Sequence, residues 1–153
     1  MMPEPISIAS IALQVLGLLR GGRGLRRKVE ISVGHGFLVY SFTPGGLGDL
    51  AIAAHATNDA AEPIVIESAG LTLDSGATAL PPPLLMRMFP RRLAQGDKQS
   101  VWFSVDELVT RLKEDDGLGL PKYAWFRDSA GREYRRRIPR ATRGTVTNFL
   151  TGK

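Results

Sequence analysis

The spacing of hydrophobic residues along the chain changes near residue 28. From Pro5 to Leu19 the sequence carries no charge, and its aliphatic residues recur with the spacing of a helix. Glycines at positions 21, 22 and 24 then end this pattern. The sequence therefore predicts an N-terminal apolar helix and a glycine- and arginine-rich joint over residues 1–27. The residues expected to form its apolar, membrane-anchoring face are Ile8, Ile11, Val15, Leu18 and Leu19.

After residue 28, apolar and polar residues alternate with period two, which is typical of half-buried strands. The Gly34–Gly36 segment is expected to be a turn or bulge, and Pro81–Pro83 to run extended along the surface. Most other breaks between apolar runs contain Gly, Pro or Asp, which favour turns. The predicted strands are 29–33, 37–42, 50–58, 64–66, 70–73 and 100–103, followed by a hairpin that pairs 122–127 with 133–138.

One helix interrupts the strands at about residues 104–115. Ser104 and Glu107 have the spacing of a capping box, and Val105, Leu108 and Leu112 continue as an apolar stripe. At the C-terminus, residues 141–153 form a polar tail that is either loose or a last short element. Seven or eight short strands with frequent turns predict an all-β, antiparallel β-sandwich over residues 28–140.

Two segments resemble a known pattern. Residues 58–73, NDAAEPIVIESAGLTL, and the Asp128-x-x-Gly131-Arg132-x-Tyr134 hairpin are similar to segments of immunoglobulin-like sandwiches in bacterial proteins. The whole layout resembles small bacterial and prophage-encoded proteins of unassigned role, which carry one N-terminal apolar helix, a basic joint and one such sandwich. The resemblance covers most of residues 5–138. It implies an immunoglobulin-like fold, and it supplies no catalytic residue.

The positive charge is concentrated next to the apolar helix. The chain has 20 Lys and Arg against 15 Asp and Glu, a net charge of +5. Residues 1–28 account for most of this excess, since Glu4 is their only acidic residue, and the remainder is nearly neutral. Positive charge after an apolar segment keeps the body cytoplasmic by the positive-inside rule. The residues expected to contact anionic lipid or phosphate are Arg20, Arg23, Arg26, Arg27 and Lys28.

The apolar segment is short for a membrane span. Its length as a helix is roughly 22 Å, whereas a bilayer core needs about 20 apolar residues. Three alternatives therefore stay open. The helix spans a membrane while short or tilted, lies in the membrane interface, or packs on a soluble body or a neighbouring subunit.

The sequence contains no cysteine and only two histidines, His35 and His55, and both are expected to be structural. No cofactor, metal site or catalytic set is predicted. A second basic cluster follows the last turn, and in a strand Tyr134, Arg136 and Ile138 would share one face. Its charges are interpreted as protection of a sheet edge, with phosphate binding as the alternative. The residues of this possible patch are Arg132, Arg135, Arg137 and Arg140.

These observations favour a non-catalytic binding or scaffold domain at the cytoplasmic face of a bacterial membrane. Its partner would be an unknown protein, contacted through sheet edges and loops. The alternative is a soluble, oligomeric structural subunit such as an accessory phage virion protein. A third hypothesis is nucleic-acid binding through the C-terminal arginines.

Overall fold

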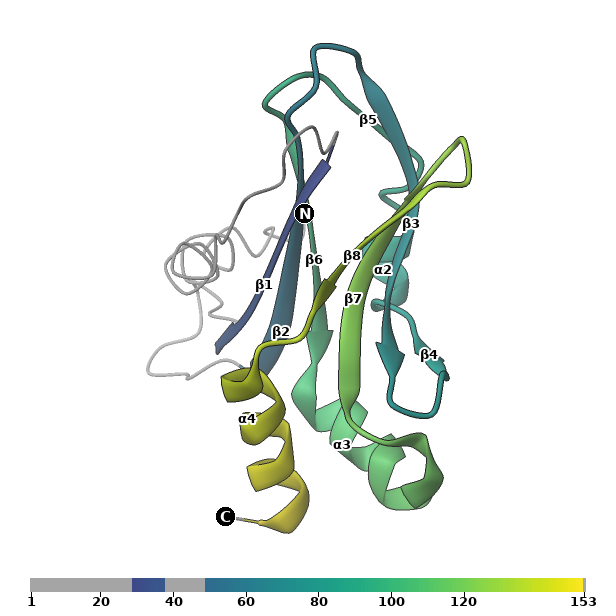
Figure 1. Ribbon diagram of the computed structural model, residues 1–153. Helices are drawn as coiled ribbons and strands as arrows, with labels where there is room; N and C mark the ends of the chain where they lie inside the picture. The colour runs from purple at the N-terminus through teal and green to yellow at the C-terminus, as the bar shows by residue number, and fades with distance from the viewer. Residues whose placement is uncertain (1–28, 38–48, 153) are drawn as a thin grey trace, which may run out of the picture.

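The computed structural model of the protein describes residues 29–37 and 49–152. The predicted N-terminal helix and its basic joint lie outside the described residues, and so do residues 38–42 of the second predicted strand. Within the described residues the chain forms two antiparallel sheets and three helices in a sandwich-like arrangement (Figure 1). The expected β-rich architecture is therefore confirmed.

The first sheet contains three strands in the order β1-β2-β6. In β2, Ile52 and Ala54 lie on one face of the strand and Ala51 and Ala53 on the other, as the alternation of a strand requires. Both sets are nevertheless buried, which explains why this strand is apolar or small on both faces. The strands are β1 (Val29–Phe37), β2 (Leu50–Asn58) and β6 (Lys98–Ser104).

The second sheet has the order β4-β3-β7-β8, and β5 pairs with β3 beyond this path. Phe126 of β7 and Ile66 and Leu71 of β3 are completely buried, and they join residues of the first sheet in one core cluster. The strands are β3 (Ile64–Leu73), β4 (Thr78–Ala79), β5 (Arg91–Leu93), β7 (Pro121–Asp128) and β8 (Glu133–Arg137).

Helix α3 confirms the helix predicted at about 104–115. The Ser104 hydroxyl accepts a hydrogen bond from the Glu107 backbone N–H at 3.3 Å, so this residue caps the helix as its spacing indicated. Helices α3 and α4 lie side by side at the same end of the strands (Figure 1). The helices are α2 (Pro83–Met86), α3 (Val105–Glu114) and α4 (Arg140–Thr151), with a 3-10 turn at Asp116–Leu118.

Two local predictions were wrong. The Gly34–Gly36 segment makes no turn, because β1 continues to Phe37 and its glycines pair with alanines of β2. Pro83 begins helix α2 instead of extending along the surface, since proline fits the first turn of a helix. Of the two alternatives for the polar tail, the last short element is present as helix α4, whose Thr142 and Val146 are buried.

The final hairpin was predicted in place. The Asp128 carboxylate accepts hydrogen bonds from the backbone N–H groups of Ala130 and Arg132 and from the Tyr134 hydroxyl. Burial, and then the bond to this carboxylate, raises the pKa of Tyr134. Gly131 has a φ of 84°, which favours glycine in the turn. The hairpin thereby fixes β8 at the edge of the second sheet.

Candidate anion-binding site: the arginine seam

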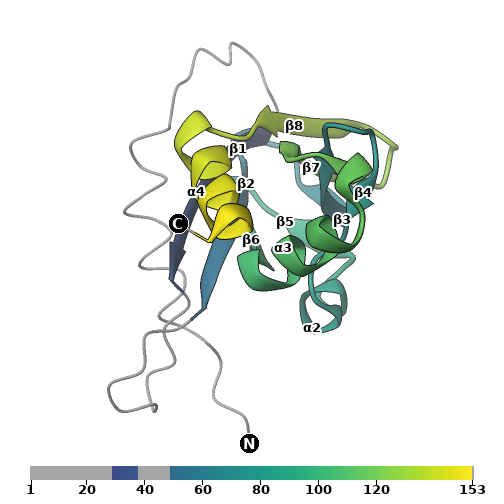
Figure 2. The same cartoon turned by 90° about the horizontal axis from the view of Figure 1, so that it is seen from below.

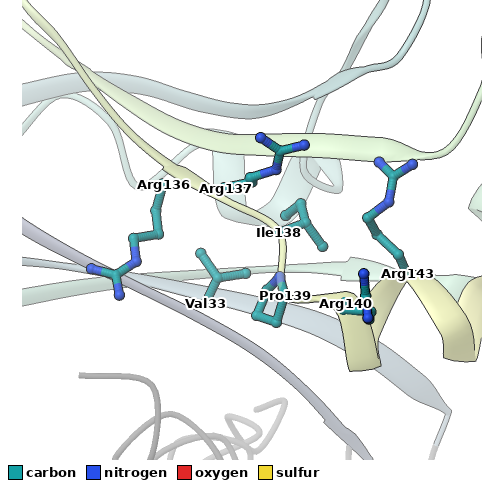
Figure 3. A pocket seen from close by; sticks show the side chains of 7 residues that line it. All are labelled: Val33, Arg136, Arg137, Ile138, Pro139, Arg140 and Arg143. Atoms are coloured by element: carbon teal, nitrogen blue, oxygen red, sulfur yellow. The ribbon is translucent and has the colours of Figure 1, made fainter. Parts of the chain in front are cut away.

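Four arginines surround a surface pocket of about 670 Å³ where β8 passes into α4. We call this group, Arg136, Arg137, Arg140 and Arg143, the arginine seam. Figure 3 shows its side chains arranged around an apolar centre, with the guanidinium groups of neighbours on β8 projecting in different directions. The apolar centre is formed by Val33, Ile138 and Pro139.

The seam lies where the edges of the two sheets meet. Strand β1 is an edge of the first sheet and β8 an edge of the second, and the two are in contact. Ile138 is only 2% exposed, and its backbone N–H donates to the Lys122 carbonyl at 2.8 Å. Pro139 then begins α4 with a φ of −60°. These contacts fix the position at which the chain turns from the strand into the helix.

The N-terminus of α4 opens onto the same pocket. Pro139 caps the helix without a side-chain hydrogen bond, and the first turn contains no acidic residue. The first backbone N–H groups of a helix have no partner within it and carry partial positive charge. Because Pro139 and Arg140 both line the pocket, this positive helix end adds to the charge of the arginines.

Arg143 of the seam is neutralised within the fold. Arg143 forms an ion pair with Asp74 at 3.0 Å and donates to the Pro121 carbonyl at 2.8 Å. The hydrogen bond from Arg143 is the main cause that lowers the pKa of the Asp74 carboxyl. In contrast, Arg137 and Arg140 are exposed and form no hydrogen bond or ion pair with the described residues. The described lining of the pocket contains no carboxylate.

The structure divides the basic patch that the sequence suggested. Arg137 and Arg140 line the seam, whereas Arg135 lies over the Tyr123 ring, 4.8 Å from its centroid, and Arg132 is in the exposed hairpin turn. Sequence analysis missed the contribution of Val33 and of the α4 N-terminus. The proline at position 139 was a signal for this helix start, since proline favours the first helical turn.

The expected alternation of β8 is present. Ile138 is buried and Tyr134 half-buried, and Arg136, which shares their face, is also half-buried. Arg135 and Arg137 are exposed on the opposite face. The predicted anchor residues of positions 5–19 and the cations of positions 20–28 lie outside the described residues.

Aromatic rings near the seam are covered by cations. Lys122 lies 5.4 Å from the centroid of the Tyr123 ring, and Arg127 lies 5.1 Å from that of Trp125. Trp125 itself is only 6% exposed. A ring must offer a free face to stack on a nucleic-acid base. These two rings therefore serve the packing of the second sheet.

The two histidines bond to hydroxyl side chains. His35 Nδ1 lies 2.8 Å from Thr142 Oγ1, which joins β1 to α4, and burial lowers the pKa of His35. His55 is 2% exposed and bonds through Nδ1 to the Ser100 hydroxyl, while its buried Nε2 has no partner among the described residues. Burial, and then the charge of Lys98, lowers the pKa of His55 to about 4.

Residues 29–37 and 49–152 contain no group of three acidic or histidine side chains that could hold a metal ion. Over the same residues, no helix combines the length and the apolar character that crossing a bilayer requires. No known protein family and no curated protein matches the sequence.

A comparison of structures finds similarity to an X-ray structure of a Northeast Structural Genomics Consortium target. The TM-score is 0.34 at 8% sequence identity, over 73% of this chain and 83% of that chain. Similarity at this level supports no conclusion about fold or function.

Proposed function

We propose that the protein is a non-catalytic binding domain that holds a phosphate-bearing ligand at the arginine seam. The observation that carries this proposal is the lining of one pocket, which contains four arginines and the uncapped N-terminus of α4 but, among the described residues, no carboxylate. The pocket volume of about 670 Å³ suits a small ligand or a lipid headgroup.

Arginine chemistry explains the choice of ligand. The guanidinium group is planar and always charged, and it donates paired hydrogen bonds that match phosphate oxygens. The first N–H groups of α4 add donors with the same preference for an anion. Cations already lie over the rings of Tyr123 and Trp125, so these two described rings do not favour base stacking, and a phosphorylated small ligand or a lipid headgroup fits better than nucleic acid.

Inorganic pyrophosphate is a suitable first probe, with binding to the full chain measured by calorimetry. Arg140→Gln is expected to weaken binding by roughly ten- to a hundredfold, since a charge-assisted hydrogen bond contributes about 1.5–3 kcal/mol. Arg111→Gln is the matched control, because this exposed arginine lies on α3 outside the seam and its loss changes the net charge equally. Equal effects of the two substitutions, or pyrophosphate binding that Arg140→Gln leaves intact, would contradict the proposal.

Competition against bound pyrophosphate then shows which kind of molecule carries the phosphate. Phosphatidylglycerol vesicles that displace pyrophosphate in an Arg140-dependent manner identify a lipid headgroup as the ligand. If vesicles do not compete, the ligand is a free phosphorylated molecule. A single-stranded oligonucleotide that competes better than either probe would instead support the nucleic-acid hypothesis.

We further propose that the domain works at the cytoplasmic face of a membrane, tethered by residues 5–19 with the cations of residues 20–28 at the lipid surface. The uncharged N-terminal segment and the basic joint support this setting. Membrane fractionation of the full chain tests the tether. The full chain is expected to stay with the membrane through salt and alkaline washes and to be released only by detergent. Release by salt alone would argue against insertion of residues 5–19.

An immunoglobulin-like topology is the finer fold that we propose. Its support is the distribution of consecutive strands over two sheets: β1, β2 and β6 belong to one sheet, and β3, β7 and β8 to the other. In immunoglobulin-like sandwiches, too, the chain passes from the first sheet to the second, returns to the first for a later strand, and ends in the second.

A further inference from the structure

A second surface of the molecule combines exposed apolar side chains with arginines. Residues 75–96 contain no acidic residue, and they include helix α2 and the short strand β5. In the view from below, α2 stands out from the body on the side opposite β8 (Figure 2). We call the exposed residues of this region, Leu80, Leu84, Met88, Arg87 and Arg92, the α2 patch.

The apolar members of the α2 patch are well exposed. Leu80 is 58% exposed, Leu84 57% and Met88 44%, although they lie within nine residues of one another. These are three of the five large hydrophobic side chains that are exposed in the described part of the chain. Their concentration in one protruding segment marks a contact surface, because single exposed hydrophobic residues are common but clusters are not.

Buried side chains and backbone hydrogen bonds fix this segment to the body of the protein. Leu85 of α2 is 8% exposed, and Leu93 of β5 is completely buried in the core. The Pro82 carbonyl accepts hydrogen bonds from the backbone N–H groups of Leu85 and Met86 at 2.9 and 3.1 Å. The apolar side chains are therefore presented on a fixed backbone, and their exposure is a property of the folded state.

The charged residues of segment 75–96 are all arginines. Arg87, Arg91 and Arg92 are exposed, and Arg91 donates to the Gln99 side-chain oxygen at 2.9 Å. Arg87 and Arg92 form no hydrogen bond or ion pair with the described residues. A partner that covers this surface must offer apolar material at the centre and negative charge around it.

We infer that the α2 patch docks on an anionic lipid bilayer, with Leu84 and Met88 entering the interface and Arg87 and Arg92 contacting lipid phosphates. A bilayer with acidic headgroups offers both required features in one surface. The apolar side chains gain burial in the interface, and each arginine near an anionic membrane adds attraction that salt weakens.

This contact leaves the arginine seam accessible. Because α2 and β8 lie on opposite sides of the molecule, a protein that rests on the membrane through the α2 patch turns the seam away from that membrane (Figure 2). In this orientation the ligand of the seam is a free phosphorylated molecule, because one molecule cannot contact the same bilayer through the α2 patch and the seam. The inference does not depend on the N-terminal tether. The site-specific test therefore separates the α2 patch from the seam and from the tether.

The absence of cysteine from the sequence allows a direct test in the full chain. Leu84→Cys carries an environment-sensitive nitrobenzoxadiazole fluorophore, and Phe149→Cys on α4, where the native side chain is 39% exposed, is the matched control. Phosphatidylcholine vesicles that contain phosphatidylglycerol are expected to shift the emission at position 84 to the blue and to leave position 149 unchanged. Vesicles of phosphatidylcholine alone are expected to give a much smaller shift.

Two double variants test the apolar and the basic residues of the α2 patch, and a third serves as the control. Leu84→Ser with Met88→Ser is expected to weaken the position-specific vesicle contact, monitored through a fluorophore at Leu80→Cys, by about tenfold or more. Arg87→Gln with Arg92→Gln is expected to weaken it on anionic vesicles only. Arg137→Gln with Arg140→Gln, in the seam, is expected to have no effect on this signal.

Three results would overturn the inference. The first is binding to vesicles without a shift at position 84, which would assign the membrane contact to another part of the chain. The second is the absence of any binding to anionic vesicles. The third is a shift at position 84 that grows with protein concentration in buffer without lipid, which would show that a second copy of the chain covers the patch.

Discussion

Protonation of His55 is expected to destabilise the protein under mildly acidic conditions. The side chain is 2% exposed in β2, and burial and Lys98 lower its pKa from 6.5 to about 4. The unfolded chain takes up a proton near pH 6.5, whereas the folded chain does so only near pH 4. The free energy of unfolding is therefore highest above pH 6.5 and decreases as the pH falls from there toward 4.

The size of this effect follows from the difference between the two pKa values. Linkage gives a loss of about 2 kcal/mol between about pH 7 and pH 5. For a domain of this size, that loss corresponds to a melting temperature lower by roughly 4–8 °C. The salt-bridged carboxyl of Asp74 does not affect this comparison. Its pKa is lowered from 3.8, so its contribution to the free energy of unfolding is lost only at a pH below the range compared.

Guanidinium chloride unfolding, followed by the fluorescence of Trp102 and Trp125, measures the effect at the two pH values. In His55→Leu the pH dependence is expected to shrink by about 2 kcal/mol, whereas His35→Gln should retain this component. Should the leucine variant not fold, the ring signals of His55 in the NMR spectrum of the native chain still decide the question. Titration of His55 near pH 6.5, or an unchanged pH dependence in His55→Leu, would refute the argument.

Two glycines are expected to respond in opposite ways to alanine. Gly70→Ala would place a Cβ atom 2.5 Å from Cζ2 of Trp125, so it should lower the free energy of unfolding by about 1–3 kcal/mol in thermal unfolding followed by circular dichroism. Gly144→Ala, in α4, meets nothing within 4 Å and should raise it by about 1 kcal/mol because alanine favours the helix. A Gly70→Ala variant that melts no lower than the native chain would contradict the first expectation, and a Gly144→Ala variant that melts no higher would contradict the second.

Elements with local signals could be predicted from the sequence. The Ser104 cap fixed the start of α3, and the Asp128–Gly131 turn fixed the final hairpin, because each depends on residues close together in the chain. The alternation of β8 likewise placed Ile138 inside and Arg137 outside. These predictions needed no knowledge of the rest of the fold.

Two helices could not be predicted from local signals. Helix α4 depends on distant partners, and the sequence signal for α2 is ambiguous. The α4 sequence is polar, and its helix is secured by burial of Val146 and by the bond between Thr142 and His35, 107 residues away. For α2, a run of prolines fits both an extended segment and the first turn of a helix. The hydrophobic period and the composition of these segments could not distinguish a helix from a loose or extended segment.

The arginine seam was predictable only in part. The cluster of arginines after position 131 was visible in the sequence, but the lining of the pocket also contains Val33, which comes from the distant strand β1. No local pattern links residues so far apart. The sequence could therefore suggest anion binding but not a bounded site for it.

The contact between β1 and α4 has a consequence for the order in which this protein is made. During synthesis the N-terminal part of a domain leaves the ribosome first, and contacts between distant residues close slowly. The seam combines Val33 with residues 136–143, so a nascent chain cannot form this pocket until residues 136–143 have been added. A product that stops before residue 136 would retain β1 to β7 but lack all four arginines of the seam. Retention of the proposed phosphate ligand would thus distinguish chains that extend past residue 143 from shorter ones.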